Sequence, residues 1–131
     1  LSQNRVAWNY DFGINVIINS QNNTIIDNEI THNQGDGISI ASTSPNNVVR
    51  RNTLSDNQEY GLSITGSSNC DILDNTITHN GYDGIRLSSH SDWFNISKNT
   101  ISSNGWDEIV PWDGLQCRNS ENGTIWSNTI S

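Results

Sequence analysis

Short motifs recur along this chain at a nearly constant interval, and that interval limits the fold more than any other feature. A glycine precedes an apolar-x-apolar triplet five times, at spacings of 24, 24, 23 and 30 residues: Gly13, Gly37, Gly61, Gly84 and Gly114. A fixed period of this kind is typical of repeat proteins, in which each unit buries its apolar face only against its neighbours. The glycines therefore predict a stack of similar units.

Two sets of asparagines repeat at the same period. One set precedes an x-Ile or x-Leu pair at spacings of 24, 23, 24 and 29: Asn28, Asn52, Asn75, Asn99 and Asn128. The other has spacings of 29, 24, 23 and 24: Asn4, Asn33, Asn57, Asn80 and Asn104. Because three independent markers share one period, we expect one structural turn per 23–30 residues.

Apolar residues divide each turn into three short strands. The first strand carries two inward rows, Ile14/Ile38/Leu62/Ile85/Leu115 and Val16/Ile40/Ile64/Leu87/Cys117. The second carries Ile25/Val49/Ile72/Ile96/Ile125, and the third carries Ile30/Leu54/Ile77/Ile101/Ile130. No stretch holds a helical apolar period over three turns, and helical repeats are longer, at about 33 residues or more. The sequence thus predicts an all-β, single-domain parallel solenoid over residues 1–131, with about five turns of three strands.

A row of charges supports this register. Asp27, Arg51, Asp74 and Lys98 stand just before the first asparagine set, and their signs alternate from turn to turn. Stacked strands lie roughly 4.8 Å apart, so opposite charges on neighbouring turns attract. We expect ion pairs between turns along this row.

Three segments resemble a known repeat family: Asn52-Thr53-Leu54, Asn75-Thr76-Ile77 and Asn99-Thr100-Ile101, with a Gly-Ile/Leu-x-Ile/Leu strand after them. This pattern resembles the right-handed parallel β-helix repeats of carbohydrate-binding and sugar-hydrolase type, with a pectate-lyase-like fold. That family includes pectate-lyase-like enzymes, alginate epimerases and archaeal surface proteins. The resemblance extends over nearly the whole chain and implies the fold. The polygalacturonase-like Asn-Thr-Asp-Gly and epimerase-like Asp-Pro-His motifs are missing, so we do not expect this chain to be an enzyme by itself.

Charge and hydropathy exclude two classes of partner. The net charge of −8 disfavours nucleic acid, whose phosphates need a basic patch. No run of about 18 apolar residues exists, so no membrane span is expected.

Acidic and aromatic side chains gather at one corner of the predicted coil. Two turns look longer than the rest, with extra residues at 5–12 and 105–113, and the intervening turns place Asp36 and Glu59 at the same corner. Aromatic rings stack on the C–H faces of sugars, whereas carboxylates, amides and Arg bond their hydroxyls. We therefore predict a polysaccharide-binding edge made of Trp8, Tyr10, Asp11, Tyr60, Tyr82, Asp83, Arg86, Trp106, Asp107, Trp112 and Asp113. The alternative is that the rings seal the rim and the acids form Asp-Gly turns.

Two weaker constellations remain open. Asp83 and Asp113 precede glycines on adjacent turns, and Arg86 follows, which makes these three the catalytic candidates if the chain is a lyase or hydrolase fragment. His32, Asp56 and His79 stack on consecutive turns, which is a metal-binding pattern or a polar row facing solvent. No cofactor is expected, although lyases of the resembling family use Ca²⁺.

The cysteines, sequons and chain ends complete the predictions. Cys117 lies on an inward row and Cys70 near a different bend, so we expect two free thiols, with Cys117 buried. Sequons at Asn22, Asn95 and Asn122 favour an extracellular or cell-surface glycoprotein. Leu1-Ser2 looks equivalent to Ile130-Ser131, with no cap at either end, so we expect a fragment of a longer coil. Open ends also suggest an alternative function: a surface-layer, sheath or fibre protein that stacks end to end.

Overall fold

The computed structural model describes residues 1–106 and 113–131, and these form three parallel sheets wrapped around one core. The β1 sheet has six strands: β1 (Arg5–Ala7), β4 (Glu29–Thr31), β7 (Thr53–Ser55), β10 (Thr76–Thr78), β13 (Thr100–Ser102) and β16 (Thr129–Ile130). The β2 sheet has five: β2 (Ile14–Val16), β5 (Ile38–Ala41), β8 (Leu62–Thr65), β11 (Ile85–Ser88) and β14 (Leu115–Cys117). The β3 sheet also has five: β3 (Thr24–Ile26), β6 (Val48–Arg50), β9 (Asp71–Leu73), β12 (Asn95–Ser97) and β15 (Thr124–Trp126).

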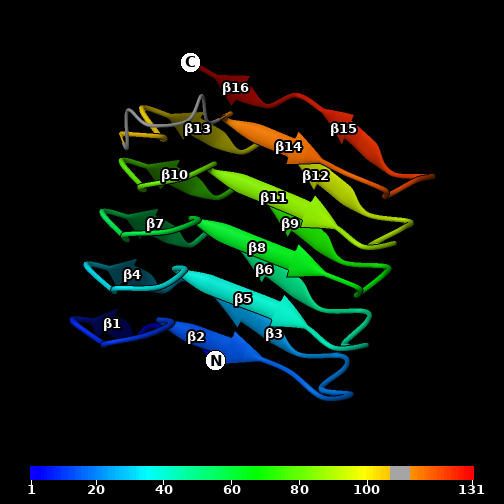
Figure 1. The fold of residues 1–131 in the computed structure, drawn as a ribbon, viewed down its shortest axis with the longest axis horizontal. Helices are drawn as coiled ribbons and strands as arrows, with labels where there is room; N and C mark the ends of the chain where they lie inside the picture. The colour runs from blue at the N-terminus through cyan, green and yellow to red at the C-terminus, as the bar shows by residue number, and fades with distance from the viewer. Residues whose placement is uncertain (107–112) are drawn as a thin grey trace.

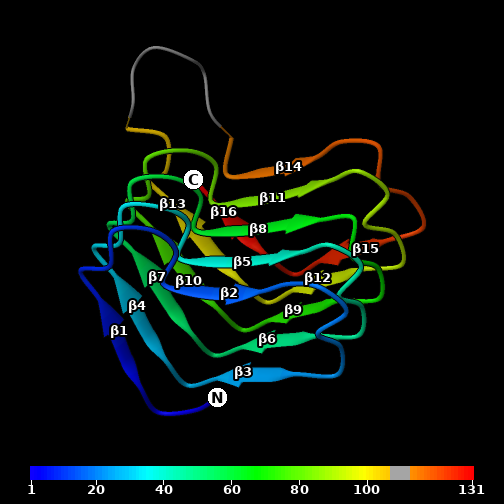
Figure 2. The ribbon, with the colours of Figure 1, turned by 60° about the horizontal axis from the view of Figure 1, so that its bottom comes forward.

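Each circuit of the chain contributes one strand to each sheet, so the molecule is a parallel β-helix. Figure 1 shows the circuits stacked from the N-terminus to the C-terminus, and Figure 2 shows the three sheets as the faces of the coil. The predicted all-β solenoid with three strands per turn is confirmed. In the described part of the chain, no helix is long and apolar enough to cross a membrane.

The core is built from aligned rows of branched aliphatic residues. Ile30, Leu54, Ile77 and Ile101 stand opposite one another in the β1 sheet, and all four are buried. The other inward rows pair as the sequence predicted, for example Ile25 with Val49. A strand of three residues buries one or two side chains, so the apolar contacts that stabilise each turn come from the turns above and below it.

Asparagine side chains fill two inward corners. Asn52 shows the pattern: its Nδ2 donates to Ile25 O (2.8 Å) and to Asn75 Oδ1 (3.1 Å), and its Oδ1 accepts from Asn28 Nδ2 (2.9 Å). Each bend leaves backbone carbonyls and N–H groups outside the strand ladders, and a buried amide bonds both kinds of group at once. The recurrent asparagines are therefore the polar partners of the bends.

The first turn corrects one part of the sequence analysis. Asn4 bonds to Asn28 (Nδ2 to Oδ1, 3.1 Å), and Asn9, not Asn4, bonds to Asn33 (2.8 Å). The residues taken as an insertion contain β1, because Val6 continues the inward row of Ile30. The first turn thus has the ordinary 24-residue length, and the long corner lies between Asn104 and Gly114.

Two smaller expectations also change. Ile130 pairs with Ile101 in the β1 sheet, whereas Leu1 O accepts from Ile26 N beside the β3 sheet, so the two chain ends are not equivalent. In the charge row, Arg51 binds Asp27 through two nitrogens (2.7 and 2.8 Å) as predicted. Asp74 instead pairs with Arg50 (3.2 Å), an outward residue of β6.

The cysteines match the prediction in bonding but not in burial. Both thiols are free, and Cys70 is buried. Cys117 does lie on the predicted inward row, opposite Leu87, but it is exposed. Because β14 is the last strand of its sheet, no further described turn covers that side chain.

Candidate functional site

Loops at one corner of the coil connect the end of each β1-sheet strand to the start of the next β2-sheet strand. Each loop begins with a residue in the left-handed backbone region, at φ of 54–63°: Trp8, His32, Asp56, His79 and Ser103. This conformation turns the chain sharply out of the strand. The parallel register places it at the equivalent position of every turn. As a result, equivalent loop residues form columns parallel to the axis.

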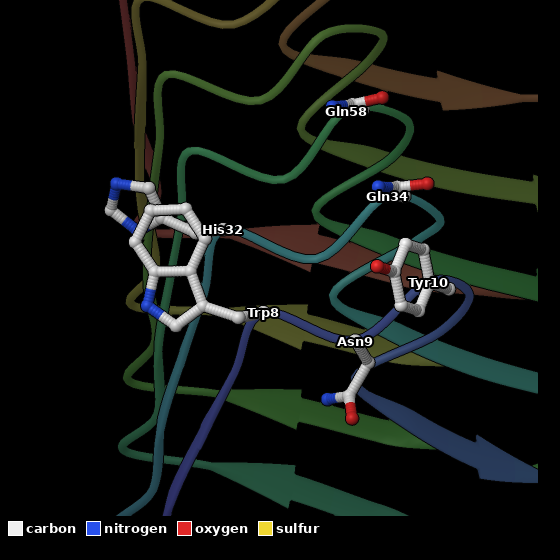
Figure 3. Close-up of a pocket in the computed structure, with 6 residues that line it drawn as sticks. All are labelled: Trp8, Asn9, Tyr10, His32, Gln34 and Gln58. Carbon is white, nitrogen blue, oxygen red and sulfur yellow. The ribbon is translucent and has the colours of Figure 1, made fainter.

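A pocket of about 310 Å³ opens between the corner loops of the first three turns. Its lining consists of aromatic, imidazole and amide side chains: Trp8, Asn9, Tyr10, His32, Gln34 and Gln58. Figure 3 shows Trp8 and His32 on one side of the pocket and Tyr10, Gln34 and Gln58 on the other.

One wall is a stacked pair of rings. The Trp8 and His32 ring centroids lie 4.4 Å apart with an angle of 30° between the planes. Thr31 Oγ1 lies 2.6 Å from His32 Nδ1, and this hydrogen bond restrains the imidazole. The Trp8 side chain is nevertheless 69% exposed. A large ring held in place but left open to water is a ready surface for an apolar ligand face.

The opposite wall is a column of polar and aromatic side chains from successive loops. Tyr10 is 89% exposed, and Gln34 and Gln58 are also exposed. Their backbones are fixed, because Gln34 N donates to Asn9 O and Gln58 N donates to Asn33 O, each at 2.9 Å. The two glutamines therefore present amide donors and acceptors at the rung spacing, roughly 4.8 Å.

The next residue in that column is Gly81, and Trp106 covers it. A side-chain carbon on Gly81 would collide with Gln58 O and would lie 3.4 Å from Trp106 Cζ2. Trp106 itself is 58% exposed. The row of corner loops thus carries exposed aromatic side chains at both ends, with amides between them.

Behind this surface, the corner contains buried acids. The Asp36 side chain is buried, and its Oδ1 accepts a hydrogen bond from Tyr60 N (3.2 Å). The pKa of Asp36 is raised to about 7, chiefly by burial and also by the neighbouring Glu59 carboxylate, whereas the hydrogen bond from Tyr60 N lowers it. Asp36 therefore forms part of the turn, as the Asp-Gly alternative proposed.

Asp83 occupies the same column two turns on. Its side chain is fully buried, and Oδ1 accepts from Asp113 N. Asp83 Oδ2 has no hydrogen-bond partner among the described residues. Burial raises the pKa of Asp83, while the Asp113 N–H and the charges of Arg86 and Arg118 lower it. This differs from the exposed position expected on a binding edge, because the carboxyl bonds the adjacent bend and does not face solvent.

A second aromatic group lies outside the pocket. Tyr60 and Tyr82 meet edge to face, with centroids 5.2 Å apart, and Arg86 Cζ lies 5.1 Å from the centre of the Tyr60 ring. All three side chains are half-buried. The Arg86 charge also lowers the pKa of Asp83, and Asp83 in turn bonds Asp113 N. Asp83, however, has no exposed surface.

The predicted edge is thus divided. Trp8 and Tyr10 line the pocket, and Asp11 lies against the next loop, with Oδ1 3.2 Å from a Cβ placed on Gly35. Trp106 lies further along the row, and Asp107 and Trp112 fall outside the described residues. The sequence analysis missed three lining residues: Asn9, Gln34 and Gln58. Aligning Asn9 with Asn33 would have put Asn9 at this corner. It would also have put Gln34 and Gln58 in one column with the predicted residue Tyr10.

Two other sets of candidates have clear positions. His32, Asp56 and His79 do lie in one column, but no three His, Cys, Asp or Glu side chains in the described part could hold a metal ion. Of the sequons, Asn22 and Asn122 are exposed in loops. Asn95 is half-buried in β12, with its Oδ1 buried. Asn22 and Asn122 are therefore more exposed than Asn95, and modification at all three remains a prediction.

Three parallel sheets, inward aliphatic rows and polar corner columns define the class as a parallel β-helix. A family model described as a right handed beta helix region matches residues 1–101. The chain therefore belongs to the right-handed β-helix family. No curated protein sequence matches it significantly.

Solved structures with the same fold include two epimerases. The periplasmic alginate epimerase AlgG superposes with a TM-score of 0.76 at 17% identity, over 96% of this chain and 39% of that one. An AlgG double mutant superposes with a TM-score of 0.82 at 18% identity, over 99% of this chain and 39% of that one. The A-module of the Azotobacter vinelandii mannuronan C-5 epimerase AlgE6 gives 0.80 at 18% identity, over 99% and 50%. At these identities the likeness shows the fold alone, and the chain spans half or less of each epimerase chain.

Proposed function

We propose that this chain is a β-helix module that binds a glycan in the corner pocket, the cavity lined by Trp8, Tyr10, His32, Gln34 and their neighbours. The observation that carries the proposal is the combination of exposed rings and exposed amides around one opening. Rings receive the C–H face of a pyranose, and the amides bond its hydroxyls. The binding face predicted from the sequence is thereby narrowed to a defined part of the corner.

The fold relatives support the same class of ligand. The epimerases are named for alginate and mannuronan, which are polysaccharides, and AlgG is periplasmic. We extend to this chain a polysaccharide partner and a location outside the cytoplasm. Columns of loops at the rung spacing also suit an extended polymer that runs along the axis.

The test uses a matched pair of tryptophans. Trp8 and Trp93 are 69% and 62% exposed, and both have a left-handed backbone, at φ of 63° and 57°. They lie at different corners, so Trp93→Ala controls for the loss of an exposed indole. Calorimetric titration against a panel of oligosaccharides should show that Trp8→Ala weakens binding by about 1–3 kcal/mol and Trp93→Ala leaves it unchanged. Equal losses in both variants, or no glycan bound by the parent, would refute the proposal.

A further inference from the structure

The charges around the corner pocket identify the class of sugar it takes. None of the chain's six Lys and Arg side chains lines the pocket, whose one imidazole is that of His32. Three are in ion pairs on the sheets: Arg5 with Glu29, Arg50 with Asp74 and Arg51 with Asp27. Two lie over aromatic rings, Arg86 over Tyr60 and Lys98 over Trp126, and the last, Arg118, follows β14.

Acidic groups, by contrast, lie next to the lining residues. The Asp11 carboxylate lies against Gly35, directly after the lining residue Gln34. Asp56 is exposed in the same column as His32, one turn further on. Glu59 follows the lining residue Gln58. The net charge of −8 adds a long-range field of the same sign.

Resting on the proposed function, we infer that the corner pocket selects uncharged sugars and rejects polyuronates. A uronate carboxylate in the pocket would lose water without gaining a Lys or Arg partner, and it would meet repulsion from neighbouring acids. Neutral hydroxyls need only the donors and acceptors that Asn9, Gln34 and Gln58 supply. The pocket chemistry therefore differs from what an anionic polymer such as mannuronan requires.

The experiment compares three ligand classes of equal chain length on the full chain, at low and at high salt: uncharged hexose or pentose oligomers, oligouronates, and oligomers of a cationic amino sugar. We expect the tightest uncharged oligomer to bind at least about tenfold more tightly than any oligouronate, with little dependence on salt. An added cation should narrow this selection. Gln34→Arg should strengthen oligouronate binding by roughly five- to tenfold, whereas Gln21→Arg, at an exposed glutamine outside the pocket, should not.

The outcomes separate the two claims. If the parent binds an oligouronate more tightly than every uncharged oligomer, and Trp8→Ala abolishes that binding, the inference fails and the proposed function stands. If an amino-sugar oligomer is preferred at high salt as well as low, the inference fails in the same way. If no oligomer of any class binds, both the proposed function and the inference fail.

Discussion

The indole of Trp8 and the imidazole of His32 stack at a centroid distance of 4.4 Å, although they are 24 residues apart and belong to successive turns. The repeat brings them together, because both begin a corner loop with the same left-handed backbone. Together the two rings form one wall of the corner pocket. Substitution of either ring should therefore weaken the binding of a ligand.

Replacing His32 with Ala should weaken glycan binding about two- to tenfold, since a stacked ring pair contributes roughly 0.5–1.5 kcal/mol. His79→Ala is the matched control, because His79 is exposed in the same column and does not line the pocket. Titration calorimetry on both variants provides the comparison. A loss with His79→Ala as large as that with His32→Ala would place the ligand elsewhere along the corner.

Asp36 should make stability depend on pH. Its pKa is about 7 in the folded chain and 3.8 as an ordinary carboxyl. Between these values the folded state holds a proton that the unfolded state releases, so the free energy of unfolding falls as the pH rises from about 4 to about 7. Asp36→Asn keeps an acceptor for Tyr60 N and removes the titration. Urea unfolding at both pH values should show the variant losing less stability than the parent across this range, by about 2–4 kcal/mol. Identical pH profiles would contradict the assignment.

Asn52→Ala should destabilise the coil by about 2–4 kcal/mol, because it removes a buried amide that bonds backbone and side-chain groups of neighbouring turns. The adjacent Thr53 is exposed, and Thr53→Ala should change the unfolding free energy by less than about 1 kcal/mol. Denaturant unfolding measures both. A small effect at Asn52 would mean that water replaces the amide at the bend.

The two thiols should differ in reactivity. Cys117 is exposed and should alkylate quickly without reductant. Burial raises the pKa of both thiols, but Cys70 is also inaccessible and should react only when the chain opens. Intact-mass measurements over time should show one rapid addition and one slow addition. Two rapid additions would contradict the burial of Cys70, and none would indicate a disulfide.

Much of the fold could be predicted from the sequence because the same residue type recurs at equivalent positions of successive turns. Glycine marks one corner, asparagine marks two, and isoleucine recurs in each inward row, so the rows around Ile30 and Ile25 followed from counting alone. The first turn was aligned wrongly, because Asn4 was matched to Asn33 and not to Asn28. Asn4 and Asn9 both suit an inward corner, and the pairing of Val6 with Ile30, with the hydrogen bonds of Asn4 to Asn28 and Asn9 to Asn33, distinguishes their columns.

The site was harder to predict, because only exposed side chains can bind a ligand and the spacing of residues does not indicate which of them are exposed. Asp36 and Asp83 look like surface acids in the sequence, yet both bond the next bend and are buried. Gln34 and Gln58 look like ordinary loop residues, yet they line the pocket. Cys117 has the spacing of a core residue but lies in the last strand of its sheet.

The most direct test of the central claim is a nuclear magnetic resonance titration that follows the indole N–H signals of the five tryptophans. With the tightest uncharged oligosaccharide, the account predicts a saturable shift of the Trp8 signal, together with shifts of the Gln34 and Gln58 side-chain amides. The Trp93 and Trp126 signals should stay in place, because neither residue lines the pocket. Saturable shifts at Trp93 or Trp126 with Trp8 unmoved would contradict it.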